Sequence, residues 1–180
     1  VNTILTGADL TDANLSGANL STANIFGIID GINILQKTKL KGANFTNANL
    51  TNTNLIGVDI SETILKGADL TGVKLEKARA ENANLEDVDL SFKNLSEIRL
   101  IDTNLSRSIL AGAELSNAKL MGANLSDADL TGAKLIDANL TNANLTGANF
   151  HMADLTGANL EGVTINETNL SCIGHEICTS

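Results

Sequence analysis

The chain has 180 residues, enough for one domain or two small ones, with 12 basic and 21 acidic residues and a net charge of −9. It contains no Pro, Trp or Tyr and only four Phe, yet 43% of its residues are hydrophobic, so its apolar content is aliphatic. These values exclude a basic nucleic-acid-binding protein and an aromatic platform for stacked bases, and they disfavour disorder; the absence of a long apolar run excludes a membrane-spanning helix.

A five-residue repeat runs through almost the whole chain. Of the 34 positions taken at every fifth residue from Leu5 to Leu170, 27 are Leu, three are Ile and two are Phe. The residue two positions earlier is usually Ala, the residue between is usually Asn or Asp, and Ser or Thr and then often Gly follow. Residues 141–160, TNANLTGANFHMADLTGANL, contain four consecutive copies.

A period of five fits neither a helix nor a continuous strand. In a helix the leucines would spiral around the axis, and in a strand successive leucines would point to opposite faces. Within one pentad, however, Ala-Asn-Leu alternates inward and outward, and Ser/Thr-Gly is suited to a corner. Four pentads with corners of about 90° would close a square coil of 20 residues, and about 8 such coils would stack at the strand spacing of about 4.8 Å.

The tandem A-(D/N)-L-x-x motif resembles the pentapeptide-repeat family and is similar to its cyanobacterial and plastid members. The resemblance covers about residues 3–172 and implies an all-β fold, a right-handed quadrilateral β-helix with the Leu slot and the small slot facing inward. We expect a repeat domain over residues 1–171, interrupted at about 26–38, and a C-terminal cap or tail over 172–180. We also expect an uncovered N-terminal end, where either a cap has been removed or a second protomer binds to form a homo-oligomer.

Residues 26–38, FGIIDGINILQKT, lose the consensus, and Asp30 falls in an inward Leu slot, where an unpaired carboxylate would be costly. The five-residue phase returns at Leu35, so any insertion is a multiple of five. One interpretation is a coil that bulges outward as a loop. The other is an apolar recognition loop for a protein partner. Its candidate residues are Ile28, Ile29, Asp30, Ile32 and Ile34.

A second irregular stretch runs from Glu76 to Arg99, where charges of both signs accumulate. Ala80 underfills a Leu slot, and Lys93 replaces a small inward residue, so we expect its stem to lie inward and its ammonium to reach outward. Mixed charges indicate a solvated surface with weak ion pairs, and the alternative is an interaction site.

With four pentads per coil, one face collects acidic residues and no Lys or Arg. The predicted acidic face comprises Asp9, Asp12, Asp30, Asp69, Asp89 and Asp129, six of the nine net negative charges. The placement of Asp9 and Asp12 requires that the 20-residue phase survives the 26–38 break. Some members of the family that the chain resembles mimic duplex DNA and bind gyrase, which makes a DNA-mimicking topoisomerase-binding protein the alternative function.

The only two cysteines, Cys172 and Cys178, lie near the C-terminus in CIGHEIC. A disulfide would close a cap, with Ile173 and Ile177 covering Leu170, and would require an oxidising compartment such as a periplasm or thylakoid lumen. Free thiols in a cytoplasmic protein are a second interpretation. A zinc site is the third, although only Cys172, His175 and Cys178 are available and a fourth ligand is missing.

No catalytic constellation is visible. Ser and Thr recur as corner residues without a nearby His, and a Leu-filled interior leaves no room for a substrate. We find no cofactor-binding or metal-binding motif either. The sequence therefore predicts a non-catalytic structural or protein-interaction rod for an unknown protein partner, without direct nucleic-acid binding.

Overall fold

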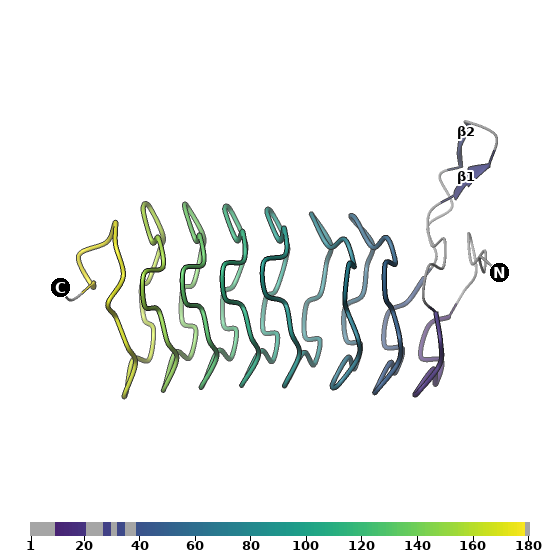
Figure 1. Ribbon diagram of the computed structural model, residues 1–180, viewed down its shortest axis with the longest axis horizontal. Helices are drawn as coiled ribbons and strands as arrows, with labels where there is room; N and C mark the ends of the chain where they lie inside the picture. Colours follow the sequence, from purple (N-terminus) through teal and green to yellow (C-terminus); the bar gives the residue numbers. More distant parts are fainter. Residues whose placement is uncertain (1–9, 21–26, 30–31, 35–38, 179–180) are drawn as a thin grey trace.

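The computed structural model describes residues 10–20, 27–29, 32–34 and 39–178. Over these residues the chain winds into coils that stack one behind another along a rod (Figure 1). Parallel backbone bridges join residues 20 positions apart, from Asn44↔Ile64 to Asn149↔Asn169, so one coil takes four pentads. The molecule is a right-handed quadrilateral β-helix, as the resemblance to the pentapeptide-repeat family implies.

Each corner of a coil is a four-residue turn. At one corner the Ala128 amide donates to the Leu125 carbonyl at 3.1 Å, and Asp127 between them has a φ of 57°. A positive φ at the third turn position favours Gly, Asn and Asp, which explains why 13 of the 15 glycines share that slot. The outward carboxylate also supports the corner, because Asp129 Oδ1 accepts a hydrogen bond from the Thr131 amide at 3.0 Å.

Backbone hydrogen bonds join neighbouring coils, and the side chains between them form one continuous core. The Leu125 amide donates to the Asn144 carbonyl at 2.8 Å, and the Asn144 amide donates to the Ala123 carbonyl at 2.9 Å. Leu125 and Ala123 are both fully buried, as the inward slots require. The underfilled slot at Ala80 is buried too, and its carbonyl accepts a hydrogen bond from the buried Thr103 hydroxyl at 2.6 Å.

The interruption of the repeat is a hairpin inserted between two stacked coils. Strands β1 (Gly27–Ile29) and β2 (Ile32–Ile34) pair antiparallel and lie away from the coil stack in Figure 1. The coils on either side stack directly, since Asn14 bridges to Asn44, 30 residues later. The excursion therefore adds ten residues to a 20-residue coil, which keeps the five-residue phase but shifts the 20-residue phase by half a coil.

The four sides of the rod are named by one inward residue each. The Leu40 face contains the pentads centred on residues 40, 60, 80, 100, 120, 140 and 160, and the Phe45, Leu50 and Leu55 faces follow at steps of five residues. Because the coil is four-sided, the Leu50 face lies opposite the Leu40 face.

A disulfide between Cys172 and Cys178 closes the C-terminal end of the described chain. Cys172 is buried, and Asp154 bridges to Ile173, 19 residues later, so the last turn departs from the repeat. Ile177 packs against the core, whereas Ile173 is 59% exposed. The disulfide interpretation is confirmed, the free-thiol and zinc interpretations are wrong, and of the two isoleucines expected in the cap only Ile177 joins the core.

Candidate functional site

The first candidate surface is the hairpin. Ile28 and Ile29 lie on β1, Ile32 and Ile34 lie on β2, and Ile29 pairs with Ile32 in the backbone register. Asp30, the fifth predicted residue, lies outside the described residues. The segment is therefore a two-stranded projection between stacked coils.

The second candidate surface is the acidic face, which the structure reduces. Asp69, Asp89 and Asp129 occupy outward positions of the Leu50 face, in the column that runs through Asn49, Ile109 and Asn149. Asp12 does not join them, because its amide donates to the Lys41 carbonyl at 2.9 Å and so stacks on the opposite Leu40 face. The predicted place of Asp12 on the acidic face is therefore wrong, because the ten-residue insertion shifts the 20-residue phase by half a coil. Asp9 and Asp30 lie outside the described residues.

Within the described residues, the ladder between two coils is broken along the Leu50 face and at the adjoining ends of the Phe45 and Leu55 faces. Four amides of one coil, at Gly67, Leu70, Gly72 and Leu75, donate no backbone hydrogen bond to the next coil, although their equivalents elsewhere do. The amides of Asp89 and Asn94 make none to the preceding coil, and the 69–89 and 74–94 bridges are missing. A cleft of about 460 Å³ lies at this junction. Its lining includes Gly67, Asp69, Gly72, Asp89 and Lys93.

Lys93 explains the break. It occupies the inward slot that Ala113 and Ala133 fill in the following coils, and a lysine there is too large for the usual coil separation. The side chain is half-buried, and burial lowers the pKa of its ammonium, an effect that attraction to Asp89 and Asp69 partly offsets. The expected inward stem and outward ammonium agree with this half-buried position.

Hydrogen bonds from the turn residues that follow them favour the ionised form of the two carboxylates beside Lys93. Hydrogen bonds from Ser91 lower the pKa of Asp89, and the Thr71 amide, which donates to Asp69 at 2.9 Å, lowers the pKa of Asp69. The Leu50 face is therefore negatively charged at neutral pH, with Lys93 set back in the cleft.

Three exposed apolar side chains lie on the Leu50 face, and the sequence analysis missed them. Phe92 is 82% exposed, Met152 is 66% exposed and Ile109 is 45% exposed. Phe92 and Met152 occupy the positive-φ corner slot, where the repeat usually has Gly, Asn or Asp and otherwise a charged residue. The available signal was an apolar residue in that slot, where it cannot contribute to the core.

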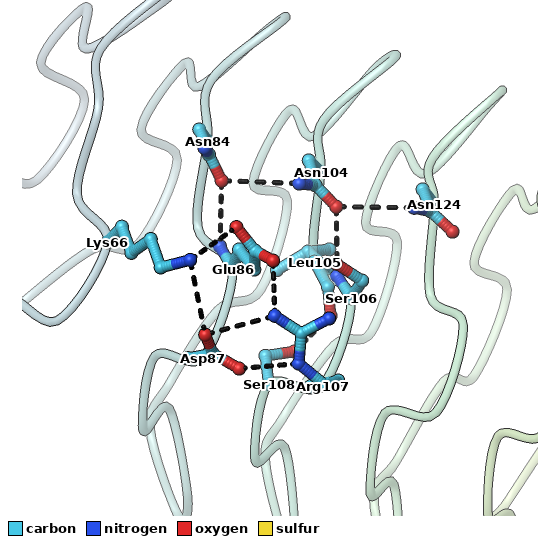
Figure 2. A network of polar contacts seen from close by, with 10 residues as sticks. All are labelled: Lys66, Asn84, Glu86, Asp87, Asn104, Leu105, Ser106, Arg107, Ser108 and Asn124. Carbon is cyan, nitrogen blue, oxygen red and sulfur yellow. Dashed lines mark hydrogen bonds and ion pairs between the residues drawn. The ribbon is translucent and has the colours of Figure 1, made fainter.

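A charged cluster marks the corner between the Phe45 and Leu50 faces (Figure 2). Lys66 lies 3.0 Å from Glu86 and 3.6 Å from Asp87, and Arg107 pairs with both carboxylates, at 2.8 Å from Asp87. These bonds lower the pKa of Glu86, mainly through Lys66, and the pKa of Asp87, mainly through Arg107. Such exposed pairs contribute little stability, and the cluster has no net charge.

The same cluster continues into a ladder of amides along the Phe45 face (Figure 2). Asn124 donates to Asn104, and Asn104 donates to Asn84, each at 3.3 Å. The ladder uses the outward amides to join coils, so this face has few unpaired polar groups for a partner.

The Leu40 face has a row of cations at outward positions. Arg79, Arg99 and Lys119 follow one another in successive coils. Arg79 pairs with Asp59 and Glu81, Arg99 also pairs with Glu81, and Lys119 makes no ion pair within the described residues. A shallow groove of about 770 Å³ lies along this row, lined by residues that include Glu97, Arg99, Asn117, Lys119 and Met121.

The described residues contain no group of three or more His, Cys, Asp or Glu side chains placed to hold a metal ion. They also include no helix with the length and hydrophobicity of a membrane span. The clefts that the described residues form are open to solvent. The candidate sites are therefore surfaces rather than enclosed pockets.

A family model described as pentapeptide repeats matches the chain in eight copies, over residues 1–27, 35–67, 54–91, 63–100, 94–127 and 123–162. Among solved structures, HetL, a pentapeptide repeat protein involved in heterocyst differentiation regulation from the cyanobacterium Nostoc sp. strain PCC 7120, is 31% identical, with 97% of this chain and 91% of that chain covered and a TM-score of 0.33. Rfr23 from the cyanobacterium Cyanothece 51142 is 30% identical, with 92% and 89% covered and a TM-score of 0.29.

Full-length QnrB1, a plasmid-mediated fluoroquinolone resistance protein, is 18% identical, with 93% of this chain and 91% of that chain covered and a TM-score of 0.50. At that identity the likeness supports the fold alone. No curated protein matches the chain.

Proposed function

Because the chain belongs to the pentapeptide-repeat family, we propose that it is a non-catalytic protein-interaction rod whose binding element is the β1–β2 hairpin. The observation that carries the proposal is the continuous ladder beneath the hairpin. The Leu15 amide donates to the Asn44 carbonyl at 2.8 Å and the Leu20 amide to the Asn49 carbonyl at 2.7 Å, so the coils stack without it.

An insertion that the fold does not need is most simply explained by a role outside the fold. The coils beside the hairpin supply a rigid support, because ladder bonds join them directly. The sequence of the hairpin strands is rich in isoleucine, and protein-binding segments commonly have such an apolar composition.

The proposed lack of catalysis is supported by the filled interior. Leu and Ala side chains occupy most inward slots of the described coils, and Phe45 and Phe150 are buried there as well. A substrate site in a repeat of this kind would have to form on the outer faces, where carboxylates recur without converging on one point.

DNA mimicry is the weaker alternative, because Asp12 does not lie on the predicted acidic face and only three of its aspartates are described there. Asp69, Asp89 and Asp129 span three coil steps, about 14 Å at the strand spacing. Duplex DNA would present about eight charges over that distance. A purified-protein supercoiling assay with no effect at micromolar concentration would eliminate this alternative.

The test is deletion of residues 25–34, which removes ten residues and joins Ala23-Asn24 directly to Leu35, restoring the A-N-L motif. We expect the variant to fold with unchanged or higher thermal stability, because Asn14 and Asn44 then stand 20 residues apart. Affinity capture from the source cells with both forms should recover a partner with the full chain and lose it with the deletion.

Two further variants sharpen this test. The double substitution Ile28→Ser and Ile32→Ser keeps the hairpin length and should weaken capture, whereas Ile64→Asn, a consensus substitution on the Phe45 face, should leave it unchanged. Recovery of the same proteins with every form would overturn the proposed role of the hairpin.

A further inference from the structure

We propose that copies of this chain associate side by side, in parallel, with the Leu50 face of one copy packed on the Leu40 face of the next. The occupant of the Leu50 face is thus a second copy of the chain. This inference goes beyond the hairpin and uses different residues.

The Leu50 face combines apolar and acidic groups. The Phe92 ring lies along the backbone of the next coil, where a Cβ on Gly112 would stand 2.6 Å from Phe92 Cδ1. Phe92 and Met152 have φ of 56° and 59°, a conformation that costs free energy for large side chains and gives no core burial in return. The described outward positions of this face also hold three aspartates and no Lys or Arg.

The middle row of the Leu40 face offers complementary cations, on a face that also contains Asp59, Glu62, Glu81 and Asp102. Arg79, Arg99 and Lys119 stand one coil apart, as Asp69 and Asp89 do on the Leu50 face. Both rows follow the same 20-residue repeat, so two parallel rods keep Asp129 half a coil from Lys119 in the closed part of the rod, whereas Asp69 and Asp89 stand on either side of the open junction.

A simple translation brings the two surfaces together. The Leu50 and Leu40 faces are opposite sides of a square coil, so a shift by one rod width sets one against the other. Asp89 then lies midway between Arg79 and Arg99 of the second copy, half a coil or about 2.4 Å along the axis from each, and Asp69 lies midway between Asp59 and Arg79.

The same translation fits Phe92 to the groove on the Leu40 face. Phe92 ends its pentad, whereas Glu97 and Asn117 lie where the Leu40 pentads begin, and opposite sides of the coil run in opposite directions. Phe92 of one copy therefore meets the groove lined by Glu97, Asn117 and Arg99 of the next. The Arg99 guanidinium can pack on the ring, a contact that is more favourable when shielded from water.

The association is open-ended. Contact between two different faces related by translation leaves a free Leu50 face and a free Leu40 face at the ends of every row. The net charge of −9 opposes growth at low ionic strength, whereas at about 0.15 M salt repulsion is screened beyond about 8 Å and the short-range pairs remain.

Sedimentation velocity of the full chain, from about 10 μM to 1 mM, tests the proposal. We expect concentration-dependent species larger than a monomer at about 0.15 M salt, with less association in very low salt and in about 1 M salt. Phe92→Asn, which suits a positive φ, should weaken association at least about tenfold, and Ile64→Asn, on the Phe45 face, should not.

A charge reversal identifies the partner face. Asp89→Lys and Arg99→Glu should each weaken association about tenfold, and the protein that carries both should regain it, because Lys and Glu then face each other across the contact. A monomer at every concentration, or association unaffected by Phe92→Asn, would overturn the proposal, as would a double variant no better than the single ones. The deletion of residues 25–34 should associate normally, which separates this inference from the role of the hairpin.

Discussion

Two coil junctions of the same rod differ in how completely they are joined. Between residues 106–115 and 126–135, the Leu110, Gly112 and Leu115 amides donate to the next coil at 2.7, 2.8 and 2.7 Å. Between residues 66–75 and 86–95, the equivalent Leu70 and Gly72 amides make no such bond.

The residue in the small inward slot accounts for the difference. Ala133 fills it in the first junction and Lys93 in the second, and the other inward residues are similar. Leucines provide the apolar area of the core, but the small slot decides how closely two coils approach. A single substitution there can open a cleft without ending the repeat.

The largest expected effect is loss of an inward leucine where the ladder is complete. Leu125 is fully buried, so Leu125→Ala should lower the free energy of unfolding by about 2–5 kcal/mol. Leu70→Ala, beside the cleft, should fall near the lower end of that range, because the loosened coil can relax into the space. Urea denaturation measures the free energy of unfolding of both variants. Equal losses of stability would mean that the two junctions do not differ in packing.

Placing Lys at position 133 and Ala at position 93 should open the closed junction and close the open one. Ala133→Lys should cost about 1–3 kcal/mol by overpacking a closed junction, and Lys93→Ala should raise stability, by up to a similar amount, as the ladder closes. Thermal unfolding of the two variants gives the sign of each change. A Lys93→Ala variant less stable than the parent protein would contradict the role given to this lysine.

A smaller effect is expected at the corners. Phe92 holds a positive φ without burial, whereas Asn142 in a regular corner has a φ of 59°. Phe92→Asn should therefore raise the free energy of unfolding by about 1 kcal/mol, and Asn142→Phe should lower it by about as much. Equal stability of all three proteins by chemical denaturation would mean that these corners tolerate any side chain.

The smallest effect is a pH dependence specific to the open junction. Burial lowers the folded pKa of Lys93, so between that value and the ordinary lysine pKa the unfolded chain binds more protons. The junction should gain stability as the pH rises through this alkaline window. The stability difference between the parent protein and Lys93→Ala should narrow as the pH rises, and a difference that does not change from pH 8 to pH 10.5 would contradict this.

The fold could be predicted because the pentad encodes it locally. Leu125 and Ala123 lie in alternating inward slots, and the Gly or Asn that follows supplies the positive φ of the corner, so each coil repeats the same short-range pattern. The tandem motif carried the resemblance to the family for the same reason, and the terminal cysteines were close enough in sequence for their pairing to be foreseen as one interpretation.

The faces could not be placed from the sequence alone. An insertion of ten residues is invisible to a five-residue phase, yet it moves Asp12 to the side opposite Asp69. The cleft escaped prediction as well, because the consequence of Lys93 depends on how the neighbouring coil responds. Ion pairs such as Lys66 with Glu86 become readable only once the 20-residue spacing is known.

Amide hydrogen exchange is the most direct measurement of the contrast between the two junctions. The Leu70, Gly72 and Leu75 amides should exchange quickly, and the Leu110, Gly112 and Leu115 amides should be strongly protected. In the Lys93→Ala variant, the three amides of the open junction should become as protected from exchange as the three amides of the closed junction. Uniform protection of all six amides in the parent protein would contradict the assignment of an open junction to Lys93.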